Sequence, residues 1–232
     1  MVAHVMPMPL PEALPAASTE FDRAWGDAAA AAPVALADAA AGADAAAAQW
    51  SGCIGRLIEI SGQSNSARSS YAVALLAAAQ CQGELTAWVE GTQGGLYPPD
   101  LAACGIDLAA LAAIRVPVAA GPHGRVRAAE LLLQSGAFGC VVVDLLAGAP
   151  PRPEIWQGRL LRLVRLHQGA VLLLTDKPAS ACSAGPLIGQ RLQPERRDIG
   201  ARGQRLQATW LKNKAAAPPW PACRRRGPEG LG

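Results

Sequence analysis

Along the middle of the chain, segments with the apolar pattern of a strand alternate with segments that have the apolar period of a helix. Short apolar runs typical of buried strands occur at Arg56–Ser61, Leu85–Glu90, Ala113–Val118, Cys140–Gly148 and Ala170–Asp176. Helical patterns separate them at Ser69–Gln82, at the start of Pro99–Leu111, at Gly124–Gly136 and at Glu154–Gln168. Because strands that alternate with helices are joined by right-handed crossovers, the pattern predicts an α/β fold with a mainly parallel central sheet flanked by helices.

The helical pattern stops after Asp176, and the chain changes character at both ends. Pro186–Leu192 and Gln204–Lys214 alternate as strands do, and they predict a small antiparallel extension of the sheet. We divide the chain into a Pro/Ala-rich N-terminal arm (residues 1–50), a core (51–214) and a Pro/Arg/Gly-rich tail (215–232). A helix is expected from Ser18 or Thr19 to about Ala30, whereas the alanine run over residues 28–48 fits either a helix or a flexible arm.

Composition narrows the class of protein. The chain has 232 residues, 51% of them hydrophobic, but no apolar run reaches the roughly 18 residues that span a bilayer. The N-terminus lacks a basic region and contains several prolines, so we expect neither a signal peptide nor membrane contact. The six cysteines form no C-x-x-C pair, which favours a reducing cytoplasm and no metal site. His4, His123 and His167 form no triad pattern with Ser and Asp, so hydrolase chemistry has no support.

Charge is distributed unevenly between the two halves. Residues 1–151 hold 6 basic and 13 acidic side chains, a net charge of −7, whereas residues 152–232 hold 15 basic and 5 acidic ones, a net charge of +10. This asymmetry indicates either an anionic partner for the second half, such as DNA, or a solvated basic face.

The stretch "GQSNSARSS", Gly62 to Ser70, follows the first strand and precedes the first core helix, which is the layout of a phosphate-binding loop. The loop pattern requires a second glycine and then a lysine, but Ala67 and Arg68 stand in those places. Ser69 keeps the hydroxyl that would reach a magnesium ion, and Asp144 ends a buried strand where a second magnesium ligand is expected. We expect a degenerate loop without ATP hydrolysis or a required cofactor, and weak ATP or magnesium binding stays open.

Four segments resemble the bacterial recombinase family RecA, in the same order along the chain. They are "IGRLIEISGQSNSARSS", "YPPDLAACGIDLAAL", "LLLQSGAFGCVVVDLLAG" and "LKNKAAAPPW". The resemblance covers residues 50 to about 222 and implies a RecA-like core. The chain departs from RecA where Thr92 or Gln93 replaces the catalytic glutamate and where the segments matching the two DNA-binding loops are short.

Those departures make the chain similar to the ImuA family, the RecA-like accessory proteins of bacterial damage-induced mutagenesis. The resemblance implies a non-catalytic adaptor in SOS-induced translesion DNA synthesis. Its implied partners are RecA, an ImuB-type polymerase-like protein and, indirectly, an error-prone DnaE-type polymerase. Two alternatives stay open: a SulA-like cell-division inhibitor and a weak DNA-dependent ATPase with a variant loop.

Two groups of residues are candidates for contact with partners. Lys212 and Lys214 match RecA lysines that reach the neighbouring subunit's ATP, so the resemblance makes them RecA-interface candidates. Arginines around the extension and tail, with one tryptophan, are candidates for binding DNA or a protein partner. This second group is Arg191, Arg196, Arg197, Arg202, Arg205, Trp220, Arg224, Arg225 and Arg226.

Overall fold

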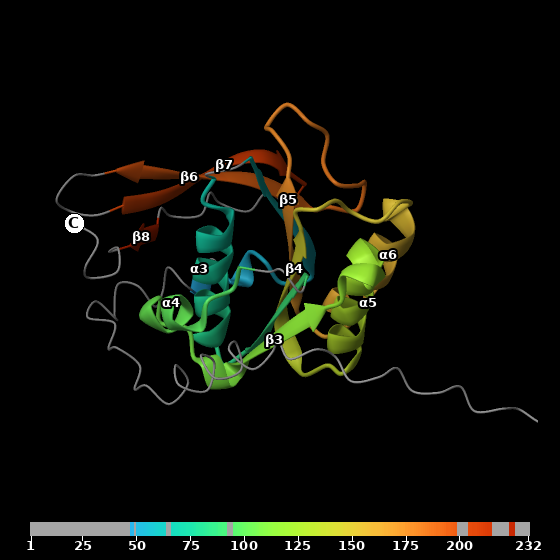
Figure 1. Cartoon of the computed structure of the whole chain (residues 1–232), viewed down its shortest axis with the longest axis horizontal. Helices are drawn as coiled ribbons and strands as arrows, with labels where there is room; N and C mark the ends of the chain where they lie inside the picture. Colours follow the sequence, from blue (N-terminus) through green and yellow to red (C-terminus); the bar gives the residue numbers. More distant parts are fainter. Residues whose placement is uncertain are drawn as a thin grey trace, which may run out of the picture.

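A central sheet with helices on both faces forms the body of the protein (Figure 1). The computed structural model describes residues 47–48, 50–63, 66–91, 95–198, 204–214 and 223–225. The expected N-terminal helix near residues 18–30 lies outside them. Within the described part, no helix has the length and apolar character needed to cross a membrane.

The core elements alternate along the chain as the sequence pattern predicts. They are β1 (Arg56–Gly62), α3 (Arg68–Gln80), β2 (Leu85–Gly91), α4 (Pro98–Ala103), β3 (Leu111–Val116), α5 (Gly121–Gln134), β4 (Phe138–Leu145), α6 (Pro153–Leu166) and β5 (Ala170–Asp176). Two short 3-10 turns, η2 (Leu108–Ala110) and η3 (Val118–Ala120), lie on either side of β3. The extension consists of β6 (Gln190–Asp198), β7 (Gln204–Asn213) and β8 (Cys223–Arg225).

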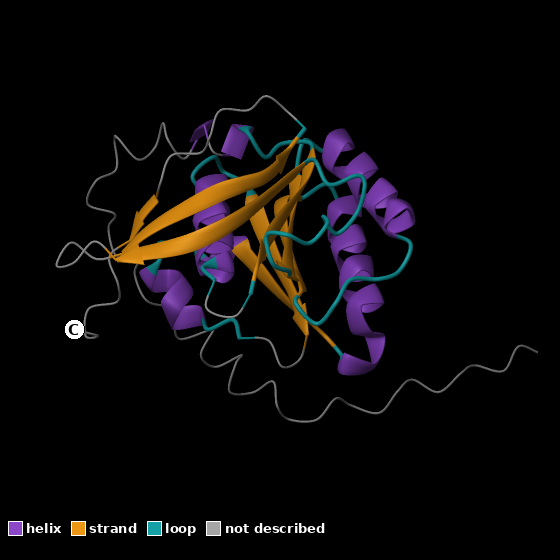
Figure 2. Cartoon of the chain, turned by 90° about the horizontal axis from the view of Figure 1, so that it is seen from above, coloured by secondary structure: helices purple, strands orange, loops and turns teal. Residues whose placement is uncertain are grey.

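The described strands form one sheet in the order β3-β2-β4-β5-β1-β6-β7-β8. The first five run parallel, and β6 continues parallel to β1 over Ile58–Ile60. The strands β7 and β8 pair antiparallel, and the β6–β7 hairpin extends beyond the parallel strands on the side of α3 (Figure 2). The predicted fold class, a mainly parallel sheet with an antiparallel extension, is confirmed.

Both faces of the sheet carry a hydrophobic core, which explains why its central strands are almost continuously apolar. Ile58, Ile60, Val142 and Leu172 pack under α3 and α4. Leu57, Val141, Val143 and Leu173 pack under α5 and α6, on the opposite face. Because parallel strands share their direction, the carboxyl ends of β1 to β5 all meet at one edge of the sheet.

Several local boundaries differ from the sequence expectation. The strand β3 (Leu111–Val116) begins and ends two residues before the predicted strand Ala113–Val118. It ends at Val116 because Pro117 has no amide hydrogen to donate to the neighbouring strand. The strand expected at Pro186–Leu192 instead begins at Gln190 and continues to Asp198. The helix predicted at the start of Pro99–Leu111 is confirmed and ends at Ala103, shortly before Gly105 with its left-handed φ of 80°. The strand β8 lies within the predicted tail, residues 215–232. The sequence does not predict it, because three residues of composition Cys-Arg-Arg show no strand periodicity.

Candidate functional site

The turn between β1 and α3 occupies the place of a phosphate-binding loop. Its described residues are Gly62, Gln63 and then Ser66 onward, with residues 64 and 65 outside the description. Ala67 precedes the helix with φ −80° and ψ 27°, so its methyl group causes no backbone strain. The amide of Ser66 donates to the carbonyl of Gln63 over 3.0 Å, which closes the loop on itself.

Arg68, which stands where a phosphate loop has lysine, is bound within the chain. Its Nη1 donates to the carbonyl of Gly62 over 2.6 Å and to that of Thr175 over 3.0 Å. The same nitrogen lies 3.1 Å from the Asp176 carboxylate in an ion pair. The guanidinium therefore joins the carboxyl ends of β1 and β5, and its charge is compensated by Asp176.

Gly62 is required here by the close approach of another side chain. A Cβ atom at this position would lie 2.5 Å from the Ser66 hydroxyl and 3.6 Å from Cδ of Arg68. The Ser66 hydroxyl is buried without a hydrogen-bond partner. A bound phosphate needs inward-pointing amides and a free cation, whereas here the Ser66 amide is bonded to the Gln63 carbonyl and Arg68 to the carbonyls of Gly62 and Thr175. These residues do not fit a β- or γ-phosphate without rearrangement.

Three charged residues form a row across the carboxyl ends of β3, β2 and β4. Arg115 pairs in register with Glu90, and Asp144 is the residue after Val143, which pairs with Val89. Nε of Arg115 lies 3.4 Å from the Glu90 carboxylate, which is buried. Burial raises the pKa of Glu90 and the charge of Asp144 raises it further, whereas Arg115 opposes both. Glu90 is thus committed to a structural ion pair.

Asp144 has a separate environment. One of its carboxylate oxygens accepts a hydrogen bond of 2.8 Å from the amide of Leu146. It lies on β4, while Ser69, the other expected magnesium ligand, is exposed near the start of α3. The strand β5 lies between β1 and β4, so the two residues are on opposite sides of it. Among the described residues, no group of three or more His, Cys, Asp or Glu side chains could hold a metal ion.

The connection between β5 and β6 is held by a buried carboxylate in β1. Glu59, with no exposed surface, accepts hydrogen bonds from the Thr175 hydroxyl at 2.9 Å, the Ser183 hydroxyl at 2.8 Å and the Ala184 amide at 2.9 Å. Nε of Arg191 lies 3.8 Å from the same carboxylate. Glu59 is thus a buried charge within an apolar strand, and Arg191 is its ion-pair partner.

The sequence profile of the RecA N-terminal domain matches residues 26–164, which is more than half of the chain. The chain belongs to the RecA family. The match includes the loop with Arg68 and the row of Arg115, Glu90 and Asp144, so both lie within the RecA-family core.

Individual relatives are similar over a shorter stretch. Protein RecA of Rubrobacter xylanophilus is 34% identical over 104 residues, which cover 44% of this chain and 28% of that protein. Protein RecA of Streptococcus pyogenes is 35% identical over 101 residues, 44% of this chain and 26% of that protein. The chain therefore matches about a quarter of the length of these curated relatives. The solved flagellar accessory protein FlaH of Methanocaldococcus jannaschii has a TM-score of 0.47 at 15% identity, over 69% of this chain and 80% of that one.

Arg191, one of the arginines expected at a binding surface, is instead buried in this RecA-family chain. Only 3% of it is exposed, and its guanidinium donates to the Ser61 hydroxyl and to the carbonyls of Pro178 and Ala181. Because these acceptors and Glu59 occupy the guanidinium, Arg191 is not part of an exposed DNA-contact surface. It positions the β5–β6 connection.

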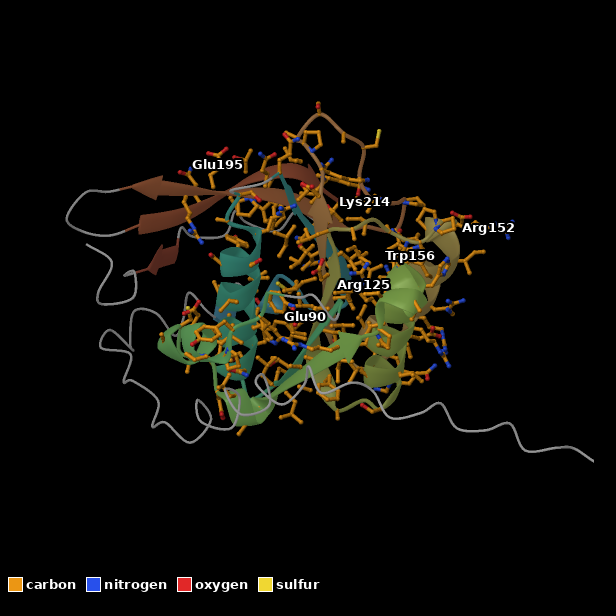
Figure 3. The ribbon with its side chains drawn as sticks, in the orientation of Figure 1. Glu90, Arg125, Arg152, Trp156, Glu195 and Lys214 are labelled. Carbon is orange, nitrogen blue, oxygen red and sulfur yellow. The ribbon has the colours of Figure 1, made fainter. Side chains whose placement is uncertain are left out.

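The two lysines expected at a RecA interface lie together at the end of β7. Nζ of Lys214, an exposed residue, donates to the carbonyl of Pro186 over 2.7 Å, and Nζ of Lys212 lies 3.5 Å from the carbonyl of Gly185. Burial lowers the pKa of the half-buried Lys212, and the charges of Lys214 and Arg191 add to this effect. The lysines therefore form a cationic group beside the β5–β6 connection; Lys214 is labelled in Figure 3.

The other candidate arginines are only partly described. Arg196 is exposed, and its Nη2 donates to the Ser70 hydroxyl over 2.7 Å. For four candidates the description covers only the backbone within the extension: Arg197, Arg205, Arg224 and Arg225. Three candidates lie outside the described residues: Arg202, Trp220 and Arg226.

The contacts of Arg68 lead to a stability prediction. Arg68→Ala leaves the carbonyls of Gly62 and Thr175 without this donor and Asp176 without its cation, so we expect a loss of about 1–3 kcal/mol in the free energy of unfolding. Urea denaturation measures it. The matched control is Arg162→Ala at an exposed position of α6, expected to change stability by less than about 0.5 kcal/mol. Equal midpoints for the two variants would contradict a structural role for Arg68.

Proposed function

We propose that this RecA-family protein is a non-catalytic adaptor in SOS-induced translesion DNA synthesis, which binds RecA and an ImuB-type polymerase-like partner. The RecA relationship rests on the domain match over residues 26–164. The adaptor role rests on the resemblance of the short loops and altered phosphate loop to the ImuA family. Through ImuB, it would serve an error-prone DnaE-type polymerase.

The observation that carries the non-catalytic part is the position of the Arg68 guanidinium. Phosphoryl transfer in this class of fold depends almost entirely on positioned charge around the β- and γ-phosphates. Here that position has a cation bonded to the Gly62 and Thr175 carbonyls and paired with Asp176. Glu90, the carboxylate at the end of β2, is paired with Arg115. Neither group is available to orient water or to neutralise a leaving phosphate.

The cationic group of Lys212 and Lys214 supports contact with an anionic partner surface. Each ammonium has three donors, and the contact with a loop carbonyl uses one of them on each lysine. Like charges that repel each other in the free protein favour an added anion. In the adaptor hypothesis that anion is the ATP held by a RecA subunit. The chain would then dock on the end of a RecA filament, while its own altered loop would not receive a further subunit.

DNA is a candidate second partner because residues 152–232 carry a net charge of +10. Because Arg191 is buried, the DNA phosphates would be contacted by Arg196 and by the arginines of the extension and tail. Contacts to phosphates are insensitive to sequence, so such binding would be modest and strongly dependent on salt.

The first test concerns ATP. Because the phosphate loop lacks a free cation, we expect no phosphate release above background, with or without single-stranded DNA, in an assay where RecA itself is the positive control. Nucleotide binding measured with labelled ATP should be weak or absent. DNA-stimulated release that is abolished by Asp144→Ala would overturn the non-catalytic assignment and favour the variant-loop ATPase.

The second test concerns the two lysines. Lys212→Ala with Lys214→Ala should weaken binding to ATP-loaded RecA filaments at least tenfold, since charge-assisted contacts to phosphate are lost. Filament length by electron microscopy should be shorter with the wild-type protein than with the double variant. The control is Lys177→Ala, which removes another lysine bonded to a loop carbonyl and should bind as wild type. Wild-type binding by the double variant would remove the lysines from the contact; binding to the tubulin-like division protein instead would favour the SulA-like alternative.

The third test concerns DNA. Affinity for single-stranded DNA should fall steeply between about 50 and 200 mM salt, and the logarithmic salt slope should decrease by roughly 0.7 for each phosphate contact removed. The variant with Arg224, Arg225 and Arg226 changed to Ala should show a smaller slope. Arg127→Ala, in the acidic half of the chain, should not. A slope that is flat, or that is the same in the triple variant, would exclude this contact.

A further inference from the structure

A cavity of about 400 Å³ lies at the carboxyl ends of β2, β3 and β4, next to the start of α5. Its walls are largely apolar and include Val116, Pro117, Val118, Leu146 and Ala147. Two charged side chains also line it, Arg125 from α5 and Asp144 from β4. The volume is in the range of small-molecule sites, and mostly apolar walls with a few polar groups are typical of them.

Arg125 is the unusual feature of this cavity. Only 8% of the residue is exposed, and its Nε has no hydrogen-bond partner. Among the described residues, no ion pair joins its guanidinium to a carboxylate. A Cβ atom on Gly91 would lie 3.4 Å from Nη1 of Arg125, so the guanidinium rests against the backbone at the end of β2. Figure 3 labels Arg125 where α5 faces the sheet. A buried cation that has no carboxylate partner among the described residues is costly, which indicates that an anion completes it.

The start of α5 adds positive potential at the same place. This helix has 14 residues, no side-chain cap at its N-terminus and no acidic residue in its first turn. Its N-terminal partial charge is therefore not compensated. Gly121, which begins the helix with a left-handed φ of 54°, also lines the cavity. Since that conformation disfavours other residues, glycine keeps this wall free of a side chain.

The neighbouring carboxylates decide which anion fits. Glu90 is engaged by Arg115 and is not among the residues that line the cavity. Asp144 does line it, and its negative charge opposes a dianion more than a monoanion. The apolar walls favour a ligand whose charged group is attached to a hydrocarbon body.

We infer that the cavity is a binding site for a small monocarboxylate with an apolar body. Its carboxylate would pair with Arg125 at the start of α5, and its body would lie against Val116, Val118 and Leu146. This site is separate from the altered phosphate loop, because Arg68 and the loop contact β1 and β5. The inference therefore does not depend on the proposed adaptor role.

To test the inference, the Tm of the full chain is measured with increasing acetate, butyrate or hexanoate at constant ionic strength. Inorganic phosphate, largely a dianion at neutral pH, serves as the comparison. Wild type should show a saturating rise in Tm, with apparent affinity increasing up to roughly fourfold for each additional buried CH₂. Phosphate should act more weakly. A saturating response to phosphate alone would overturn the assigned ligand class, and no saturating response to any probe would overturn the site.

Three variants test whether the rise in Tm comes from binding at Arg125. Arg125→Met should abolish the Tm rise while leaving the ligand-free protein at least as stable as wild type, because no carboxylate among the described residues loses an ion-pair partner. Arg127→Met is the matched control: this exposed residue of the same helix pairs with Glu130, and its ligand response should equal that of wild type. Val118→Glu provides a second variant at a residue 70% exposed, so folding should be retained. Its carboxylate would occupy Arg125 and remove the response. A full response in both Arg125→Met and Val118→Glu would refute the inference.

Discussion

The buried pair of Glu59 and Arg191 is the interaction on which the two parts of the sheet depend. It lies on β1 and β6, the strands at which the parallel sheet meets the antiparallel extension. Removing one partner of such a pair leaves an uncompensated charge in the interior, which typically costs about 3–5 kcal/mol. Through the hydroxyl of Ser183, the amide of Ala184 and the carbonyls bound by Arg191, the same pair also determines the path of the β5–β6 connection. The lysines at the end of β7 gain their carbonyl partners from that connection.

Most of the fold could be predicted from the sequence because the core strands are strongly apolar and the helices between them are periodic. Boundaries differed at strand ends: Pro117 ends β3 before the predicted Val118, and β6 begins at Gln190 rather than at Pro186. The strand β8 could not be predicted, since three residues carry no period and their pairing with Gln204–Leu206 is a long-range property.

The candidate site was predicted in its residues but not in its contacts. The sequence identified Arg68 as a departure from the loop pattern, but not the carbonyls that it binds, those of Gly62 and of Thr175, which is 107 residues away along the chain. The sequence does not distinguish Arg191 from the other basic residues of this region, because tertiary packing decides which of them is buried. Arg125 was missed, although a signal exists: it is spaced by four residues from Ala129 and by eight from Leu133, both buried, so a charge lies on the apolar stripe of α5.

The way Ser66 lies over Gly62 affects how this protein could change over evolutionary time. In the described loop, a hydroxyl fills the space above the glycine, a backbone amide closes the turn, and a guanidinium joins two strand ends. These features support one another, so a single change of Arg68 to lysine would remove a structural contact without opening the loop. A lineage with this arrangement would face a stability loss when any one of these residues changes first. The altered loop is therefore held in place by packing as well as by any selection on function.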